Sequence, residues 1–207
     1  GGGGGSVAGT SGIGGTGVRV AGVGIGTTTG FGSVIINDVR VFTIDSETKI
    51  LRDGSEITET ELELEGEGFM TRVEIGTDVS PDFTSGTAVT VAVDNHIKGP
   101  VTAINPLTVL GQSVVATADT VLADLTNLTD LAVTDEVEVS GFSDDNNVIQ
   151  ATRIQRKAGG IPVWKLSGRV SNVTPGGFNI STQRVLLNGV VPRDCGTGLV
   201  NGDLVEG

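Results

Sequence analysis

Short runs rich in Val, Ile and Thr occur along most of the chain, and Gly, Asn, Asp and Pro separate them. Within many runs apolar and polar residues alternate with a period of two, which is typical of strands with one buried face. The best helical candidate, Thr58 to Leu64, alternates Thr or Glu with Leu at either period. We interpret it as a short turn or helical loop that leads into a strand, expected over Glu61 to Glu65. The pattern predicts an all-β protein.

The same pattern occurs more than once along the chain. Strand signals begin near Gly30, Gly99 and Gly168, at a spacing near 69 residues. A period of this kind indicates repeated small units and argues against one large sandwich. We predict tandem small OB-like antiparallel β-barrels with a Gly-rich N-terminal strand. The expected boundaries are 1–29 for the leader and donor strand, 30–96 and 97–162 for two barrel units, and 163–207 for an incomplete unit.

The cores of the first two units are expected to use the apolar residues that alternate along their strands. Closing each antiparallel unit into a barrel also removes its sheet edges. The expected core residues are Val34, Ile36, Val41, Val101, Ile104, Val109, Val137, Val139 and Ile154.

The third unit lacks the last strands of the repeat. Residues 164–173 match the start of the second unit, and residues 202–206 match 134–138, after which the sequence ends. A β-unit without its final strands exposes an unpaired edge that can accept another strand. The expected acceptor residues are Trp164, Leu166, Val170, Val173, Leu204 and Val205.

The N-terminal region contains a candidate for the missing strand. After a stretch rich in Gly, Ser and Thr, four apolar residues alternate with small residues, and their phase slips once at Ala21-Gly22. A β-bulge at this point would bring both pairs to one face. We therefore expect a second copy of the chain to be the partner, with head-to-tail strand exchange forming a homopolymer. The expected donor residues are Val18, Val20, Val23 and Ile25.

Composition narrows the range of partners. The chain has 207 residues with a net charge of −12, and its aromatic content of 3% includes one Trp and no Tyr. This charge repels phosphate backbones, so nucleic acid is not expected as a partner. No run of 18 apolar residues occurs, so no membrane span is expected.

Candidate catalytic chemistry is sparse. His96 is the one histidine and Cys195 the one cysteine, so the two residues cannot form a zinc site or a disulfide. No paired nucleophile and base can be recognised, and the Gly-rich segments lack the Lys of a phosphate-binding loop. We expect no enzyme activity, no cofactor and no metal.

Two acidic segments are the remaining candidates for an ion site. Six glutamates crowd residues 56–67, and Asp144 to Asn147 form a second cluster, but neither has the spacing of a calcium loop. We interpret them as a solvated strand edge and a turn. Asn127, Asn172 and Asn179 stand in glycan-acceptor sequons, which we interpret as coincidental.

Three segments resemble a known bacterial family of unknown function. They are Gly30 to Val39, Gly99 to Gln112 and Leu131 to Gly141, and the similarity is strongest over 99–157. Members of that family carry tandem small OB-like barrels in secreted or lipid-anchored proteins. The resemblance implies five-stranded barrels and a place in the cell envelope or outside the cell, and it brings no catalytic residues. The Gly-rich start without Met also suggests an exported, processed chain.

Two classes of function agree with the sequence. The first is a structural subunit of an extracellular filament, assembled by β-strand donation. The second is an envelope binding module that recognises a glycan or a partner protein. The unfinished unit at one end and the spare strand at the other favour assembly. The small number of aromatic residues disfavours sugar binding.

Overall fold

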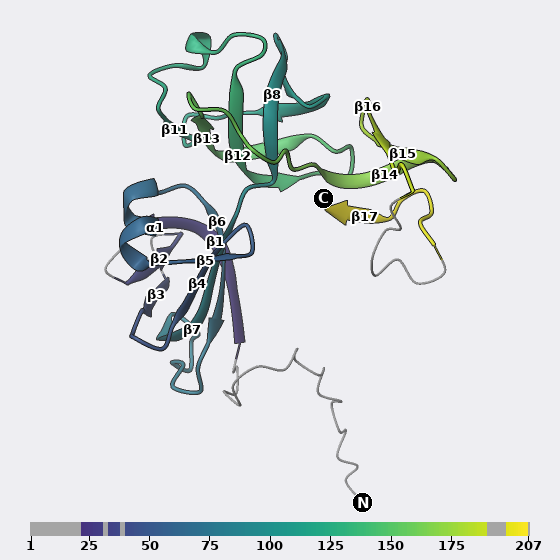
Figure 1. Ribbon diagram of the computed structural model, residues 1–207. Coiled ribbons are helices and arrows are strands. Elements are labelled where there is room, and N and C mark those ends of the chain that lie inside the picture. The colour runs from purple at the N-terminus through teal and green to yellow at the C-terminus, as the bar shows by residue number, and fades with distance from the viewer. Residues whose placement is uncertain (1–21, 31–32, 38–39, 190–197, 207) are drawn as a thin grey trace, which may run out of the picture.

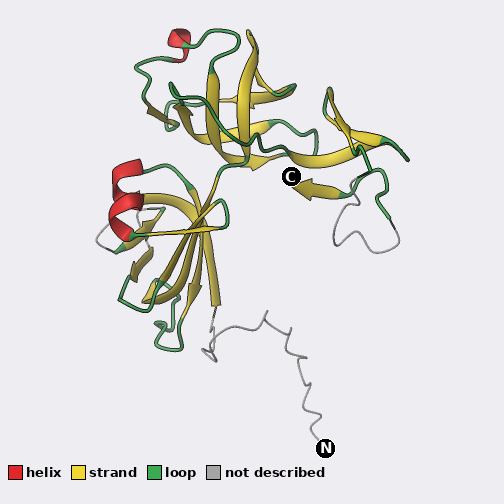
Figure 2. Ribbon diagram, in the orientation of Figure 1, coloured by secondary structure: helices red, strands yellow, loops and turns green. Residues whose placement is uncertain are grey.

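The computed structural model contains three β-units in succession (Figure 1). The structure describes residues 22–30, 33–37, 40–189 and 198–206. Two units are closed five-stranded barrels, which confirms the predicted tandem barrels. We refer to them as barrel one, residues 22–94, and barrel two, residues 97–156. Within these residues, short helical segments interrupt the strands, and Figure 2 draws them in red.

Barrel one is a ring in which every strand pairs with two neighbours. Its ring strands follow the order β1-β2-β3-β7-β6, and β6 closes the ring on β1. All ring pairs are antiparallel except β3 with β7. The ring strands are β1 (Gly22–Gly30), β2 (Val34–Ile36), β3 (Arg40–Thr43), β6 (Met70–Ile75) and β7 (Ser85–Asp94).

Between its third and fourth ring strands barrel one carries a hairpin and a helix. The hairpin consists of β4 (Lys49–Arg52) and β5 (Ser55–Ile57), and β4 pairs in parallel with β7. Helix α1 (Glu59–Glu65) begins after Thr58, whose hydroxyl accepts a hydrogen bond from the Glu61 backbone while the Glu61 carboxylate accepts one from Thr58. This capping box explains why a helix forms here, and the strand expected over Glu61 to Glu65 is wrong.

Barrel two repeats the ring with the same strand order. Its third and fifth ring strands, β10 and β13, are again the parallel pair. The additional strand β11 (Val121–Ala123) pairs in parallel with β13, and a short 3-10 helix, η1 (Leu128–Asp130), follows it. The ring strands are β8 (Ile97–Ile104), β9 (Leu107–Val109), β10 (Gln112–Val115), β12 (Glu136–Ser143) and β13 (Ile149–Arg156).

The third unit is an open sheet of four strands, in the order β16-β15-β14-β17. We call it the third sheet. Its members correspond to the first four ring strands of a barrel, and no counterpart of β7 or β13 occurs among the described residues. The strands are β14 (Ser167–Thr174), β15 (Gly177–Ile180), β16 (Gln183–Leu186) and β17 (Leu204–Glu206).

A glycine in the first strand of each unit permits close packing of a side chain in or next to the second strand. A Cβ atom on Gly26, Gly99 or Gly168 would lie within 3.0 Å of a side chain of the same unit. The side chains in question belong to Ile36, Leu110 and Ile180. The structural repeat therefore places Gly26, rather than Gly30, in register with Gly99 and Gly168.

Most of the predicted core residues are confirmed as buried, and two are wrong. Val41 is 42% exposed and Ile104 is 39% exposed. In β3 the inward residue is Phe42, which is fully buried beside Val41. In β8 a register shift between Val101 and Ala103 leaves Ile104 at the end of the strand, opposite Leu107. The confirmed residues are Val34, Ile36, Val101, Val109, Val137, Val139 and Ile154.

The expected boundary between leader and first unit also differs from the structure. β1 is the first ring strand of barrel one, so residues 22–29 belong to that barrel. Val23 and Ile25 pair with β6 of their own chain, opposite Glu74 and Arg72, and their side chains point outward. They are therefore not part of a free strand in this arrangement, because glycines take the inward positions. Val18 and Val20 lie outside the described residues.

The contrast between two isoleucines in barrel two gives a test of this core assignment. Ile154→Ala is expected to lower the free energy of unfolding of barrel two by about 2–5 kcal/mol, because Ile154 is fully buried. The matched change Ile104→Ala is expected to cost less than about 1 kcal/mol, since that side chain is partly exposed. Urea unfolding followed by circular dichroism measures both. Equal losses would contradict the assignment.

Candidate assembly site

Among the described residues, no strand takes the place in the third sheet that the fifth ring strand takes in the two barrels, and we call this place the open position. In barrel one β7 pairs antiparallel with β6 and parallel with β3, and in barrel two β13 pairs likewise with β12 and β10. The corresponding strands of the third sheet are β17 and β16, which form its two edges. A strand between them would close a third ring.

Inward side chains beside this position are more exposed than their counterparts in the barrels. The strand registers align Val185 with Phe42 and Val114, which are 0% and 4% exposed. They also align Val205 with Val137, which is fully buried. Val185 and Val205 are only half-buried. The two inward side chains are therefore more exposed at the place where the described part of the third sheet has no fifth strand.

The predicted acceptor residues lie in different surroundings. Val170 is buried with Phe178 and Ile180 in a small core, and Leu166, Val173 and Val205 pack around that core. Leu204 points outward and is 69% exposed. Trp164 lies apart from the core, where its indole Nε1 donates to the Glu136 carboxylate over 3.1 Å. Four of the six expected residues thus share one cluster, while Leu204 and Trp164 lie outside it.

Sequence reasoning missed the side chains of β15, of β16 and of the residue after β16 that complete this core. Phe178 and Ile180 are buried in β15, and Val185 and Leu187 pack against the same cluster. Their alternation, Phe178-x-Ile180 followed by Val185-x-Leu187, was a usable signal for a half-buried hairpin.

A cleft of about 460 Å³ lies between barrel one and the third sheet. One wall is the outer face of β1 and β6, with Ile25, Met70 and Arg72, and the opposite wall is β17. In Figure 1 the β17 arrow lies below β14. Ile25 and Leu204 contribute exposed aliphatic surface to the cleft. Neither Phe nor Trp lines it, so the cleft does not favour the glycan-binding alternative.

Direct hydrogen bonds fix the third sheet to barrel two. The backbones of Lys98 and Lys165 exchange two hydrogen bonds of 3.0 Å, and the Ser167 hydroxyl donates to the His96 carbonyl. The Asn147 side chain accepts from the Arg169 amide over 2.8 Å and donates to the Arg169 carbonyl over 3.0 Å. These hydrogen bonds, together with the covalent connection, therefore fix the position of the third sheet relative to barrel two.

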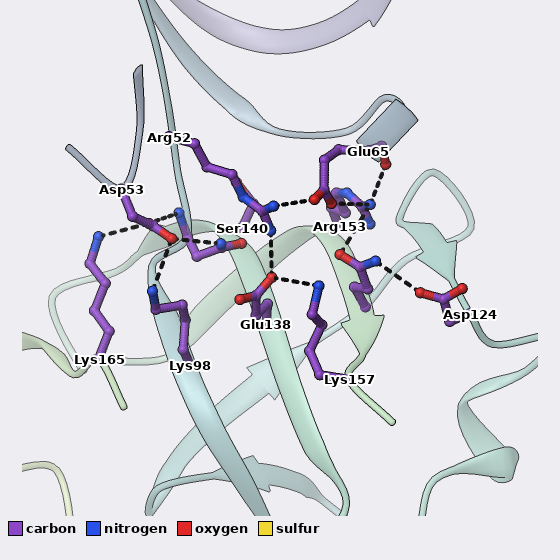
Figure 3. Close-up of polar contacts among 12 residues, drawn as sticks. Arg52, Asp53, Glu65, Lys98, Asp124, Glu138, Ser140, Arg153, Lys157 and Lys165 are labelled. Atoms are coloured by element: carbon purple, nitrogen blue, oxygen red, sulfur yellow. Dashed lines mark hydrogen bonds and ion pairs between the residues drawn. The ribbon is translucent and has the colours of Figure 1, made fainter. Parts of the chain in front are cut away.

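A polar network joins barrels one and two (Figure 3). Arg52, at the end of β4, donates to the carboxylates of Glu65 in α1 and Glu138 in β12. Lys157 lies 3.6 Å from the same Glu138 carboxylate. The Ser140 hydroxyl accepts from the Met70 amide and donates to the Asp94 carbonyl, both over 2.8 Å.

Asp53 is the residue that links all three units. It forms a two-residue hairpin turn with Gly54, and both residues have positive φ, which favours Asp-Gly at this place. Its carboxylate accepts from the Asn95 amide over 2.9 Å and from the Lys98 ammonium over 3.1 Å. The Lys165 ammonium lies 3.4 Å away. The Asp53-Gly54 sequence was a usable hairpin signal, but it could not reveal these partners.

The environment of Asp53 changes its acidity. Burial by itself would raise the pKa of this carboxyl group. The hydrogen bonds from Asn95 and Lys98 and the charge of Lys165 outweigh burial, so the pKa is lower than its ordinary value of 3.8. Asp53 is therefore ionised at neutral pH and attracts both lysines.

Arg153 is a buried cation at the same interface. Its side chain is 2% exposed, and its guanidinium lies 4.7 Å from the centre of the Phe69 ring. One nitrogen donates to the Glu65 carbonyl, while Nε and Nη1 have no hydrogen-bond partner in the part of the chain that the structure describes. Burial lowers the pKa of Arg153, and the Glu65 charge opposes that shift.

His96 lies at the junction of the barrels and borders the cleft. Burial, followed by the charge of Lys165, lowers its pKa, so the ring is neutral at pH 7. Its Nε2 is buried without a hydrogen-bond partner among the described residues. Cys195 lies outside the described residues.

Two further observations concern metals and membranes. Within residues 22–30, 33–37, 40–189 and 198–206, no three His, Cys, Asp or Glu side chains are grouped to hold a metal ion. Over the same residues, no helix has the length and apolar character needed to span a membrane.

The acidity of Asp53 leads to a prediction for pH. Asp53→Asn keeps a residue that tolerates the turn but removes the charge, so it is expected to reduce stability at pH 7. A lowered folded pKa stabilises the fold above the unfolded value of about 3.9, and this contribution is lost as pH falls through the folded pKa. The difference in stability between the unchanged protein and Asp53→Asn, which we call the gap, should therefore narrow as the pH falls from about 5 to about 3. Thermal unfolding across this range measures it, with Asp119→Asn in an exposed turn as control. A gap independent of pH would contradict the prediction.

Comparison with known proteins gives a match for barrel two. No curated protein and no solved structure has significant similarity to the chain. One protein family matches, and its match covers residues 98–155, which is nearly the whole of barrel two. Residues 98–155 therefore form a DUF5666 domain, a domain of unknown function.

Proposed function

We propose that the protein is a structural subunit that assembles outside the cell by β-strand addition to the third sheet. A neighbouring copy supplies the strand, so that successive copies join head to tail into a filament. The observation that carries the proposal is that β16 and β17 are both sheet edges with no fifth strand between them among the described residues. The same fold fills that position in both barrels of this chain.

The exposed surface beside the open position supports a strand as the occupant. Val185 and Val205 face the place of the missing strand, and each corresponds to a buried position of the closed barrels. An added strand would satisfy the free backbone groups of both edges and cover these side chains at once. A compact ligand could not pair with two strand edges along their length, so the geometry favours an extended peptide segment.

The proposal leads to a paired test at β16. Val185→Asp is expected to abolish assembly, because the strand would bury an unpaired charge. Leu186→Asp, one position along, is expected to assemble like the unchanged protein, since Leu186 points outward and is 62% exposed. Sedimentation velocity over a range of concentrations and electron microscopy measure assembly. Circular dichroism verifies that each variant retains its β-structure.

A second measurement keeps the proposal testable if Val185→Asp disrupts the third sheet. A synthetic peptide with the sequence of 148–157, which contains the fifth strand of barrel two, is expected to occupy the open position and stop assembly. Unchanged protein that stays monomeric at every concentration would overturn the proposal. So would a longer form of the polypeptide whose following residues fill the same position and keep it monomeric.

A further inference from the structure

His96 is the residue at which all three units meet. It stands in the short connection between β7 of barrel one and β8 of barrel two. Its amide donates to the Val139 carbonyl of barrel two over 2.7 Å, and its carbonyl accepts from the Ser167 hydroxyl of the third sheet. Its imidazole ring borders the cleft between barrel one and the third sheet. The state of this ring therefore bears on how the third sheet is attached.

The surroundings of the ring fit a neutral imidazole. Its Nε2 is buried and has no hydrogen-bond partner among the described residues. One nitrogen of a neutral imidazole carries no proton, so this atom then needs no acceptor. An imidazolium has a proton on both nitrogens, and Nε2 would become a buried charged donor without an acceptor. The attached arrangement therefore opposes protonation of His96.

The charged groups around the ring come from several elements. The Lys165 ammonium, just before β14, disfavours a second positive charge on the ring, whereas Glu206 of β17 favours it. The same ammonium is held by Asp53 over 3.4 Å and by Glu206 over 2.6 Å. Arg72 of β6 and Asp94 of β7 also line the cleft, while β1 and β12 contribute uncharged residues. Attachment of the third sheet thus keeps a cation close to His96.

We propose that His96 makes the attachment of the third sheet sensitive to acid, because protonation of its ring favours detachment of the sheet from both barrels. Detachment breaks the Ser167 bond to the His96 carbonyl and the pair of backbone bonds between Lys98 and Lys165. It also moves the Lys165 ammonium away and gives Nε2 access to water. The detached arrangement therefore accepts a proton more readily, and by linkage acid favours it.

Acid is the direction that weakens the attachment. Burial, and then the charge of Lys165, lowers the pKa of His96 below its ordinary value of 6.5. A solvated ring titrates near about 6.5, so attachment weakens as the pH falls from there toward the folded pKa. Asp94 acts in the opposite direction, because burial raises its pKa above 3.8. The effect of Asp53 lies below about pH 5, since its pKa is lowered.

Amide hydrogen exchange in the full chain measures the attachment. The amides of Lys98 and Lys165 bond each other's carbonyls, so their protection factors report opening of this contact. In the unchanged protein both factors are expected to fall at least about threefold between about pH 7.5 and about pH 5.5. In His96→Gln, which does not titrate, they are expected to stay constant over this range. Equal falls in both proteins would overturn the proposal.

A second amide distinguishes detachment from unfolding. The Gly76 amide donates to the Thr87 carbonyl of barrel one over 2.9 Å, and neither residue lines the cleft. Its protection factor is expected to stay unchanged over the same pH range. A fall as large as that of Lys165 would show that acid acts on the fold of barrel one, and it would count against the proposal.

The ring itself gives a direct measurement if His96→Gln fails to fold. His96 is the one histidine of the chain, so its ring protons give a single set of NMR signals. Titration of the unchanged protein is expected to give a pKa below 6.5, and Lys165→Gln is expected to raise it by removing the nearby charge. The control Lys49→Gln, at an exposed position of β4, is expected to leave it unchanged. A ring that titrates at 6.5 or above in the unchanged protein would overturn the proposal.

The outcomes for detachment and for strand addition are independent, because exchange is measured at concentrations at which the protein is monomeric. If acid weakens the attachment in a protein that never assembles, the proposed function fails and this inference stands. If the protein assembles but the protection of Lys165 does not respond to acid, the inference fails and the proposed function stands.

Discussion

Closure of a five-stranded ring is the constraint on which both barrels of this protein depend. The fifth strand pairs with the fourth in one direction and with the third in the other, so one segment satisfies the free backbone groups of two edges. It also covers the inward side chains of both neighbours. Phe42, Val114 and Val185 occupy equivalent positions, yet only the two that lie beneath a fifth strand are fully covered. The presence of a fifth strand, rather than hydrophobicity, distinguishes their burial.

The contact between barrels one and two has a different physical character from the barrel cores. It is built from charged and hydroxyl groups, with Arg52 between two carboxylates and Ser140 bonded to two backbone groups of barrel one. Hydrogen bonds of this kind depend on direction, whereas apolar contacts tolerate sliding. The buried Arg153 adds to this requirement, because a small displacement would remove its Glu65 partner and its contact with Phe69. The interface therefore favours one relative orientation of the two barrels.

The sequence predicted the architecture well because strand alternation and the glycine positions are local signals. The predictions for Val41 and Ile104 failed where two apolar residues are adjacent, as in Val41-Phe42, or where a register shift changes the phase, as before Ile104. The capping box at Thr58 was visible in the sequence and would have identified α1. The polar network was not accessible, since Arg52 and Glu138 are 86 positions apart in the chain. No local pattern encodes such a pairing.

Asp53 has a mechanical consequence for a chain of this architecture. Its carboxylate accepts hydrogen bonds from Asn95 at the barrel junction, from Lys98 in barrel two and from Lys165 at the start of the third unit. A pulling force on the third sheet is therefore transmitted through Lys165 directly to barrel one, in parallel with the covalent path through barrel two. The third unit is thus held to barrel one by a contact that does not pass through barrel two.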